Sequence, residues 1–189
     1  MKKVIASIFL SLDGYVAGKN QDMGWVMNNF NEEMGVYAGN LMASMGAVLL
    51  GRVTYQIMTN AWPNFTEETS PGADRMNNVP KIVFSRTLDK VEWGKYNNAR
   101  LVKDNAAEEI AKLKAQPGGD LVIYGSANLV QNLTEQGLID EYQLLVFPVL
   151  LGGGKPLFKG SPEPIQLKLL RTQTFKNGVV VLYYEPVRK

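Results

Sequence analysis

Three short segments combine glycine, hydroxyl and arginine residues at points where an apolar run of the chain ends. They are Gly51-Arg52-Val53-Thr54, Ser85-Arg86-Thr87 and Gly125-Ser126-Ala127-Asn128. Glycine allows the backbone to approach a ligand closely, a hydroxyl donates a hydrogen bond, and arginine contacts a phosphate through two N–H groups. A tight turn and solvated charges explain each segment equally well when it is taken alone. Together they indicate a site for a dinucleotide diphosphate and a 2′-phosphate, which predicts NADP as cofactor.

The amino-acid inventory removes most other catalytic chemistry. The chain has no Cys and no His, so thiolate nucleophiles, zinc–thiolate sites and a Ser-His-Asp triad are excluded. We expect no metal. The sequence lacks G-x-G-x-x-G, and the stretch 152–155 is followed by Pro156 where a phosphate-binding P-loop requires Ser or Thr. Chemistry done by a cofactor, by carboxylates or by binding alone remains.

Three carboxylates are candidates to donate a proton. Asp13 ends the first apolar run, but Asp-Gly is also a common turn pair whose carboxylate bonds its own backbone. Glu32 and Glu33 stand where a helix is predicted to begin, and complementarity with the helix dipole explains them without catalysis. The residues alone do not decide among these carboxylates, and only the family resemblance described below makes Asp13 the candidate catalytic residue.

Aromatic residues could form an apolar wall for a flat substrate ring. Trp25 and Tyr55 are the candidates for substrate contact, with Tyr15 and Trp62 beside them. Aromatic residues of a protein core look the same in sequence. The methionines of the predicted first helix, Met34, Met42 and Met45, are assigned to packing.

Hydrophobic patterning predicts the elements that must position these residues. Predicted strands cover 4–12, 47–50, 81–85, 99–102, 120–124, 139–149, 165–175 and 178–186, and predicted helices cover 31–44, a stretch starting at 54–58, one between 105 and 118, and 127–136. We expect a surface loop with a short helix over 62–78, Asn31 as a helix cap, and a capping box between Asn105 and Glu108. Asn177-Gly178 predicts the turn of a closing hairpin.

Strands that alternate with helices indicate an α/β fold with helices on both faces of one mixed, mostly parallel sheet and a C-terminal antiparallel hairpin. We expect a single domain over residues 1–189, because a chain of this length buries roughly 70% of its unfolded surface. A net charge of +2 argues against a nucleic-acid partner. No apolar run is long enough to span a bilayer, so we expect no membrane partner and a cytoplasmic protein.

Several motifs occur in order along nearly the whole chain: SLDGYVA at 11–17, LGRVTY at 50–55, KIVFSR at 81–86, YGS at 124–126, LIDE at 138–141, and a glycine-rich loop at 152–154 inside 147–158. In these motifs the chain resembles the dihydrofolate reductase-like superfamily. It is most similar to the group of the C-terminal reductase domain of the bifunctional riboflavin-biosynthesis deaminase-reductase.

The resemblance implies a dihydrofolate reductase-like fold and an NADPH site formed by 51–54, 85–87 and Gly125 to Leu129. It implies that the arginine and hydroxyl residues lie near the adenosine 2′-phosphate. It also implies that the first strand and the loop after Asp13 face the nicotinamide and a small-molecule substrate, with Gly153 at the substrate. The segment 148–158 is expected to close the pocket and to join a dimer interface.

Some features of the chain depart from the family pattern, and they exclude the deaminase activity of the bifunctional enzyme. The deaminase half of the bifunctional enzyme holds zinc through His and Cys, and this chain has neither, so only the reductase remains. The GRVTY motif is more similar to dihydrofolate reductase, whereas LIDE and the glycine-rich loop are more similar to the riboflavin enzyme.

We therefore predict an NADPH-dependent reductase of a pyrimidine- or pterin-linked substrate, similar to 5-amino-6-(5-phosphoribosylamino)uracil reductase of riboflavin biosynthesis. Dihydrofolate reductase is the alternative. A nucleotide-binding module of the same fold without turnover, and a phosphate-binding regulator or transferase, are further alternatives. The apolar hairpin over 167–184 presents a sheet edge, which favours a homodimer.

Overall fold

The computed structural model describes residues 2–160 and 163–187. The single-domain prediction also covers 1, 161–162 and 188–189, which lie outside the described residues. One eight-stranded sheet forms the centre of the described chain, in the order β5-β4-β3-β6-β1-β7-β10-β9. Its strands are β1 (Val4–Ser11), β3 (Met45–Gly51), β4 (Lys81–Phe84), β5 (Ala99–Val102), β6 (Asp120–Gly125), β7 (Glu141–Phe147), β9 (Leu167–Thr174) and β10 (Val180–Pro186).

Six neighbouring strands, from β5 to β7, run parallel, and β10 and β9 close the sheet as an antiparallel hairpin. The central strands are buried on both faces, which explains why they are continuous apolar runs without alternation. Because the strands from β5 to β7 are parallel, their carboxyl ends all reach the same edge of the sheet. The α/β fold with a mixed, mostly parallel sheet is confirmed.

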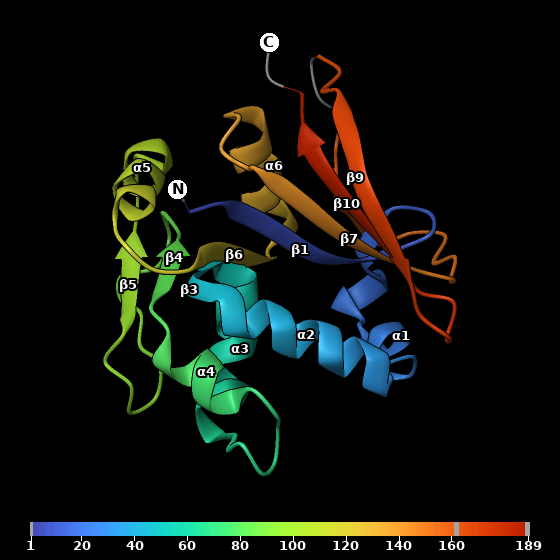
Figure 1. Cartoon of the computed structure of the whole chain (residues 1–189). Helices are drawn as coiled ribbons and strands as arrows, with labels where there is room; N and C mark the ends of the chain where they lie inside the picture. The colour runs from blue at the N-terminus through green and yellow to red at the C-terminus, as the bar shows by residue number, and fades with distance from the viewer. Residues whose placement is uncertain (1, 161–162, 188–189) are drawn as a thin grey trace.

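Helices cover both faces of the sheet (Figure 1). The helices are α1 (Gly24–Met27), α2 (Glu32–Ser44), α3 (Arg52–Ala61), α4 (Ala73–Asn78), α5 (Ala106–Ala115) and α6 (Ala127–Glu135), with 3₁₀ turns η1 (Lys19–Gln21) and η2 (Trp62–Asn64). One hydrophobic core lies under α2, α3 and α4, and a second lies under α5 and α6. The three methionines assigned to packing are buried in the first of these cores.

Two helix N-caps were predicted from the sequence, and the structure confirms one of them. Asn31 caps α2 by accepting a 3.0 Å hydrogen bond from the backbone N–H of Met34, as predicted. The capping box at Asn105 is wrong, because Asn105 has a left-handed backbone with φ of 56° and its side chain makes no capping bond. An N-cap side chain reaches the first turn only from an extended backbone. Glu108 instead pairs with Lys112 one turn later.

The stretch 62–78 contains η2 and α4, so the short helix expected within this loop is present. One short feature lies where no regular element was predicted. A small ribbon pairs β2 (Tyr15–Ala17) with β8 (Lys155–Pro156) in antiparallel orientation. The ribbon is held tightly, since a Cβ on Gly154 would lie 2.1 Å from the carbonyl oxygen of Ala17. It joins the turn after β1 to the glycine-rich loop after β7.

Candidate functional site

The ends of β3 and β6 are in direct contact at the carboxyl edge of the sheet. Leu50 of β3 is in register with Gly125 of β6. A Cβ on Gly51 would lie 2.4 Å from Ser126 Oγ and 2.9 Å from Ser126 N, and a Cβ on Gly125 would lie 2.7 Å from Thr54 Oγ1. The backbone nitrogen of Ser126 cannot move aside for a side chain at Gly51, and Gly125 has a backbone φ of 129°, which L residues rarely adopt, so both positions favour glycine. We call Gly51, Thr54, Gly125 and Ser126 the glycine junction.

Helices α3 and α6 both begin at this junction. Their N-cap residues, Gly51 and Ser126, make no side-chain capping hydrogen bond. The first-turn N–H groups of both helices are therefore not capped by these side chains, and they carry the partial positive charge of a helix N-terminus. Two helix N-termini in contact at one strand edge suit an anionic group such as a diphosphate. Val53 belongs to the first turn of α3, and Ala127, Asn128 and Leu129 belong to that of α6; their contact with the cofactor stays a prediction.

The third predicted segment follows β4, the strand beside β3. Phe84 is in register with Gly51, so Ser85 comes directly after a neighbour of the glycine junction. Ser85 Oγ accepts hydrogen bonds of 3.2 Å from the backbone N–H groups of Thr87 and Leu88, which makes it part of a local turn.

Both arginines predicted to contact phosphate are exposed at the carboxyl edge. Arg86 lies 3.4 Å from Asp104, with both side chains largely exposed. Arg52 donates a 3.3 Å hydrogen bond to Gln56 one turn later on α3. Such exposed contacts are worth little and are easily exchanged for a stronger anionic partner. The two guanidinium groups are thus available at this edge.

Asp13 lies in the turn after β1, and its carboxylate has three hydrogen-bond partners. It accepts a 2.6 Å bond from Ser11 Oγ, a 3.1 Å bond from Leu151 N and a 2.8 Å bond from Gly152 N. The Ser11 hydroxyl, followed by the two backbone N–H groups, lowers the pKa of Asp13 below its usual value. Asp13 is therefore ionised at neutral pH and accepts hydrogen bonds from the glycine-rich loop.

The glycine-rich loop connects this turn to the glycine junction. Lys155, which follows the loop, donates a 2.5 Å hydrogen bond to Asn128 Oδ1 in the first turn of α6. Gln131 of α6 donates a 2.6 Å bond to the carbonyl oxygen of Leu157. The segment after β7 is thus bonded to the turn after β1 at one end and to α6 at the other. Gly153 lies within this segment, and a Cβ on it would lie 3.7 Å from Lys19 Cε.

The predicted substrate-contact aromatics are both buried. Trp25 packs edge-on against Phe147 at 5.1 Å between ring centroids, and its indole N–H donates to the Asp22 carbonyl oxygen at 3.2 Å. The Tyr55 hydroxyl donates to the carbonyl oxygen of Glu92 and accepts from its N–H, at 2.9 and 2.8 Å. Packing explains both rings, and substrate contact stays a prediction for them, as it does for Gly153.

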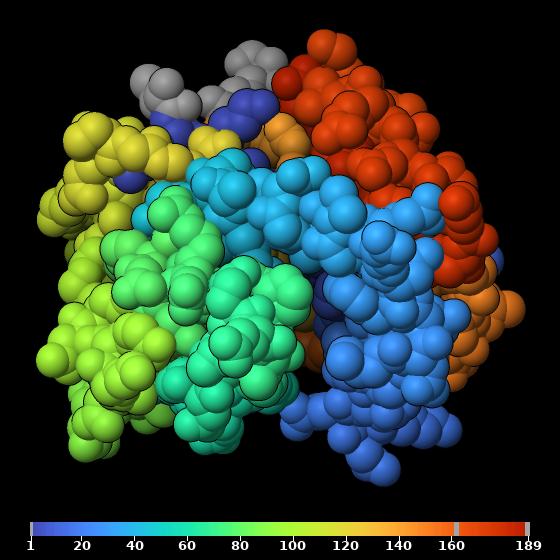
Figure 2. Space-filling model, turned by 60° about the horizontal axis from the view of Figure 1, so that its bottom comes forward, coloured from blue at the N-terminus to red at the C-terminus, as the bar shows by residue number. Residues whose placement is uncertain are grey.

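Figure 2 shows the molecule hollowed on one face, between the blue segment after β2 and the teal-to-green segment around α3 and α4. Dark blue atoms of the N-terminal part are visible deep in this hollow. The exposed side chains of Met27 and Phe30 belong to that blue segment. The hollow therefore opens onto atoms of the N-terminal part of the chain.

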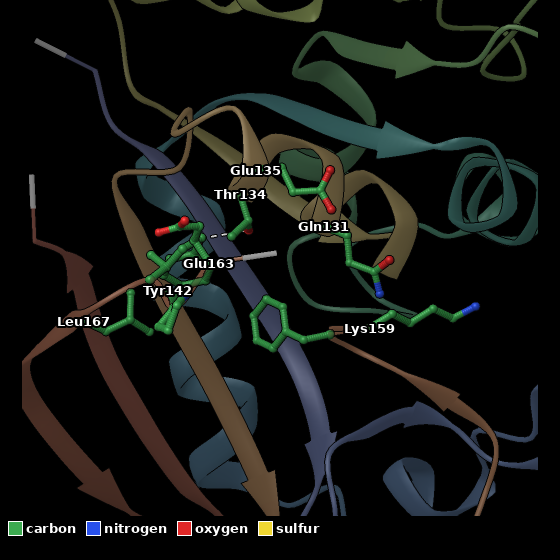
Figure 3. A pocket seen from close by; sticks show the side chains of 10 residues that line it. Gln131, Thr134, Glu135, Tyr142, Lys159, Glu163 and Leu167 are labelled. Carbon is green, nitrogen blue, oxygen red and sulfur yellow. Dashed lines mark hydrogen bonds between the residues drawn. The ribbon is translucent and has the colours of Figure 1, made fainter. Parts of the chain in front are cut away.

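Two further cavities lie away from the glycine junction. One, of about 530 Å³, lies under α2 near the amino ends of the parallel strands and is lined by polar residues such as Tyr37, Gln143 and Arg171. The other, of about 390 Å³, lies between α6, β7 and the segment before β9 (Figure 3). In it Tyr142 and Thr134 share a 2.8 Å hydrogen bond. Neither cavity is lined by a residue of the glycine junction.

Two residues near the site were not among the predicted site residues. Lys155 had a signal in the sequence, because it follows the three glycines of the loop; it was considered only as a P-loop lysine. Tyr124 precedes Gly125 and has a buried hydroxyl without a hydrogen-bond partner within the described chain. Burial raises the pKa of Tyr124. Nothing in the sequence distinguishes this tyrosine from other strand aromatics.

No helix in residues 2–160 and 163–187 has the length and apolar character that a membrane crossing requires.

Among curated proteins, the chain is 32% identical over 188 residues to the uncharacterized protein YyaP of Bacillus subtilis. The matched region covers 97% of this chain and 94% of that protein. The chain is 28% identical over 182 residues to the uncharacterized protein YwjB of the same organism, covering 96% and 97% of the two chains.

Solved structures show the same fold. A putative riboflavin biosynthesis protein from Shewanella sp. PV-4 is similar with a TM-score of 0.80 and 27% identity, over 98% of this chain and 99% of that one. A deaminase/reductase of Thermotoga maritima, described as acting on a phosphoribosylaminopyrimidine and a phosphoribosylaminouracil, is similar with a TM-score of 0.72 and 16% identity, over 98% of this chain and 57% of that one.

The family model described as the RibD C-terminal domain matches residues 2–181. This match covers both strand ends of the glycine junction, the turn at Asp13 and the glycine-rich loop. Together with the relative of 32% identity, it shows that the chain belongs to the RibD C-terminal domain family of reductase-type domains, which have the dihydrofolate reductase-like fold.

Proposed function

We propose that this chain is an NADPH-dependent reductase that transfers a hydride to a pyrimidine- or pterin-linked substrate, similar to 5-amino-6-(5-phosphoribosylamino)uracil reductase. The glycine junction carries the proposal, because it joins two helix N-termini through positions that exclude side chains. Membership of a reductase-type family supports a nicotinamide cofactor. The proposal includes a cytoplasmic location.

The residues present fit the cofactor. The glycine junction leaves backbone N–H groups open to a diphosphate, and Arg52, Arg86 and Ser85 would hold a 2′-phosphate beside it. When bound, the dihydronicotinamide supplies the hydride. The chain itself would bind and orient both reactants. Substrate would enter the hollow seen in Figure 2.

Removal of either predicted 2′-phosphate contact tests the cofactor assignment. Arg52→Ala and Arg86→Ala should each weaken NADPH binding by about 10-fold or more and change NADH binding less than about twofold, because a hydrogen bond to a charged group is worth roughly 1.5–3 kcal/mol. Fluorescence titration with both cofactors measures this. Lys112→Ala, which removes an exposed cation from α5, is the control. Equal losses for NADPH and NADH would reject the 2′-phosphate role, and absence of binding to either would reject the function.

Measurements of turnover with different substrates distinguish the riboflavin-type reductase, dihydrofolate reductase and a binding module without turnover. A panel of dihydrofolate and 5-amino-6-(5-phosphoribosylamino)uracil, each with NADPH oxidation followed at saturating cofactor, distinguishes dihydrofolate reductase from the riboflavin-type reductase. One observation favours a binding module without turnover: the carboxylate of Asp13 is ionised and already bonded to its own chain. Cofactor binding without oxidation across the panel would support that module.

We also propose that two copies of the chain associate through β9. This strand is the edge of the sheet, and Leu167, Leu169 and Leu170 on it are 38–48% exposed. Unpaired edge strands with exposed apolar residues are usually covered by a partner. The mass in solution, measured by light scattering, should be twice 21.0 kDa, and Leu169→Lys should give the single-chain mass. Lys112→Ala on α5 is the control, and a wild-type mass of 21.0 kDa would reject the dimer.

A further inference from the structure

The Asp13 carboxylate connects two parts of the chain that are far apart in sequence. Its partners Leu151 and Gly152 lie in the loop after β7, whereas Asp13 follows β1. Ser11, which is fully buried, donates to Asp13 and also accepts a 2.9 Å bond from Tyr15 N, so the carboxylate itself is held in place. These hydrogen bonds lower the pKa of Asp13, so at neutral pH the carboxylate is ionised and carries no proton to donate.

The loop held by Asp13 determines where Lys155 lies. Lys155 is paired with Ala17 in the β2–β8 ribbon, and its ammonium group reaches Asn128 in the first turn of α6. In the described part of the chain no ion pair joins Lys155 to Asp or Glu, and its partner Asn128 is a neutral amide. Burial and the nearby Lys159 lower the pKa of Lys155. The cation therefore stands uncompensated beside the glycine junction, where an anion would stabilise it.

We propose that Asp13 is a positioning residue that holds the loop over 149–155, so that Lys155 contacts an anionic group of the cofactor at the start of α6. The proposal rests on the proposed function, since that function supplies the anion. It replaces proton donation by Asp13 with an indirect role. Asp13 acts on cofactor affinity through Lys155, and it touches neither the cofactor nor the substrate.

The test combines amide exchange with cofactor binding. In Asp13→Asn, the amides of Leu151 and Gly152 should exchange at least about 10-fold faster, because their charged acceptor is lost. The Kd of NADPH should rise by about 5- to 20-fold, while kcat at saturating cofactor changes less than about threefold and its pH profile keeps its shape. The same exchange data show whether the variant is folded.

Variants of the lysines complete the experiment. Lys155→Met should raise the Kd of NADPH as much as Asp13→Asn does, with no change in exchange at the loop amides, and Lys155→Arg should keep most of the affinity. Asp13→Asn and Lys155→Met should remove the same contact between Lys155 and the cofactor. The variant that carries both changes should therefore bind NADPH no more weakly than the weaker of the two single variants. Lys159→Met, an exposed neighbour on the same segment, is the matched control and should bind normally.

Three results would overturn the proposal. Unchanged exchange at Leu151 and Gly152 in Asp13→Asn would show that the carboxylate does not hold the loop. Unchanged Kd in Asp13→Asn and Lys155→Met, with wild-type binding intact, would reject the role of Lys155 and leave the proposed function standing. A loss of kcat of about 100-fold with unchanged Kd would make Asp13 a catalytic residue. If the wild type does not bind NADPH, the proposed function fails, and with it the role of Lys155.

Discussion

Gly51→Ala is expected to weaken the binding of NADPH by at least about 100-fold, which corresponds to roughly 2.7 kcal/mol. The added Cβ would lie 2.4 Å from Ser126 Oγ, 2.9 Å from Ser126 N and 3.3 Å from Leu129 Cβ. The Ser126 hydroxyl can rotate away, but the backbone nitrogen at the start of α6 cannot. The N-termini of α3 and α6 must therefore separate, and they can no longer contact one diphosphate.

The measurement is a fluorescence titration with NADPH, together with urea unfolding to show that the variant is folded. Gly39→Ala is the matched control: Gly39 is exposed in α2 and a Cβ on it meets nothing within 4 Å. Alanine is the better helix former by about 1 kcal/mol, so this control should gain stability and bind NADPH as the wild type does. Wild-type affinity in Gly51→Ala would show that the cofactor does not bind across the glycine junction.

The free energy of unfolding should rise between pH 7 and pH 9.5, and Lys81 should cause most of the rise. Lys81 is fully buried, donates hydrogen bonds of 2.7 and 2.8 Å to the carbonyl oxygens of Asn77 and Val79, and lies 4.6 Å from the ring centroid of Trp93. Burial lowers its pKa from 10.5 to about 7. Between these values the unfolded chain binds the extra proton, so stability increases with pH.

The expected slope is up to about 1.4 kcal/mol per pH unit, and the total rise between pH 7 and pH 9.5 is about 3 kcal/mol. Urea unfolding at half-unit intervals measures it, and the series stops at pH 9.5, before tyrosines ionise in the unfolded chain. Lys81→Met should flatten the curve over this range. Lys112→Met, at an exposed position of α5, should leave the slope unchanged. Parallel curves for the wild type and Lys81→Met would contradict the prediction.

The strands and most helices could be predicted from the sequence because their signals are local. The buried strands are continuous apolar runs, and Asn31 caps α2 through contacts three residues away. The capping box at Asn105 failed because one backbone angle decides it, and the sequence pattern does not report that angle. The β2–β8 ribbon was missed because its strands are three and two residues long, too short for any periodicity.

Some features of the candidate site could likewise be predicted from local sequence, and others depend on the tertiary structure. Gly51 and Gly125 could be singled out because they end apolar strands, and the parallel sheet brings such ends to one edge. Their direct contact depends on β6 lying next to β3, which no local pattern encodes. The role of Asp13 depends on partners 138 and 139 residues away, so its own neighbours in sequence show only a turn.

The place of β6 between β3 and β1 has a consequence for how this protein is made. β1 leaves the ribosome first, yet neither of its neighbours, β6 and β7, exists before residue 120 has been added. An early nascent chain therefore carries β1 with both edges unpaired, a state in which strands are prone to aggregate. Until α6 is synthesised, only half of the glycine junction is present. The cofactor proposed for this junction would therefore become able to stabilise the fold only late in synthesis.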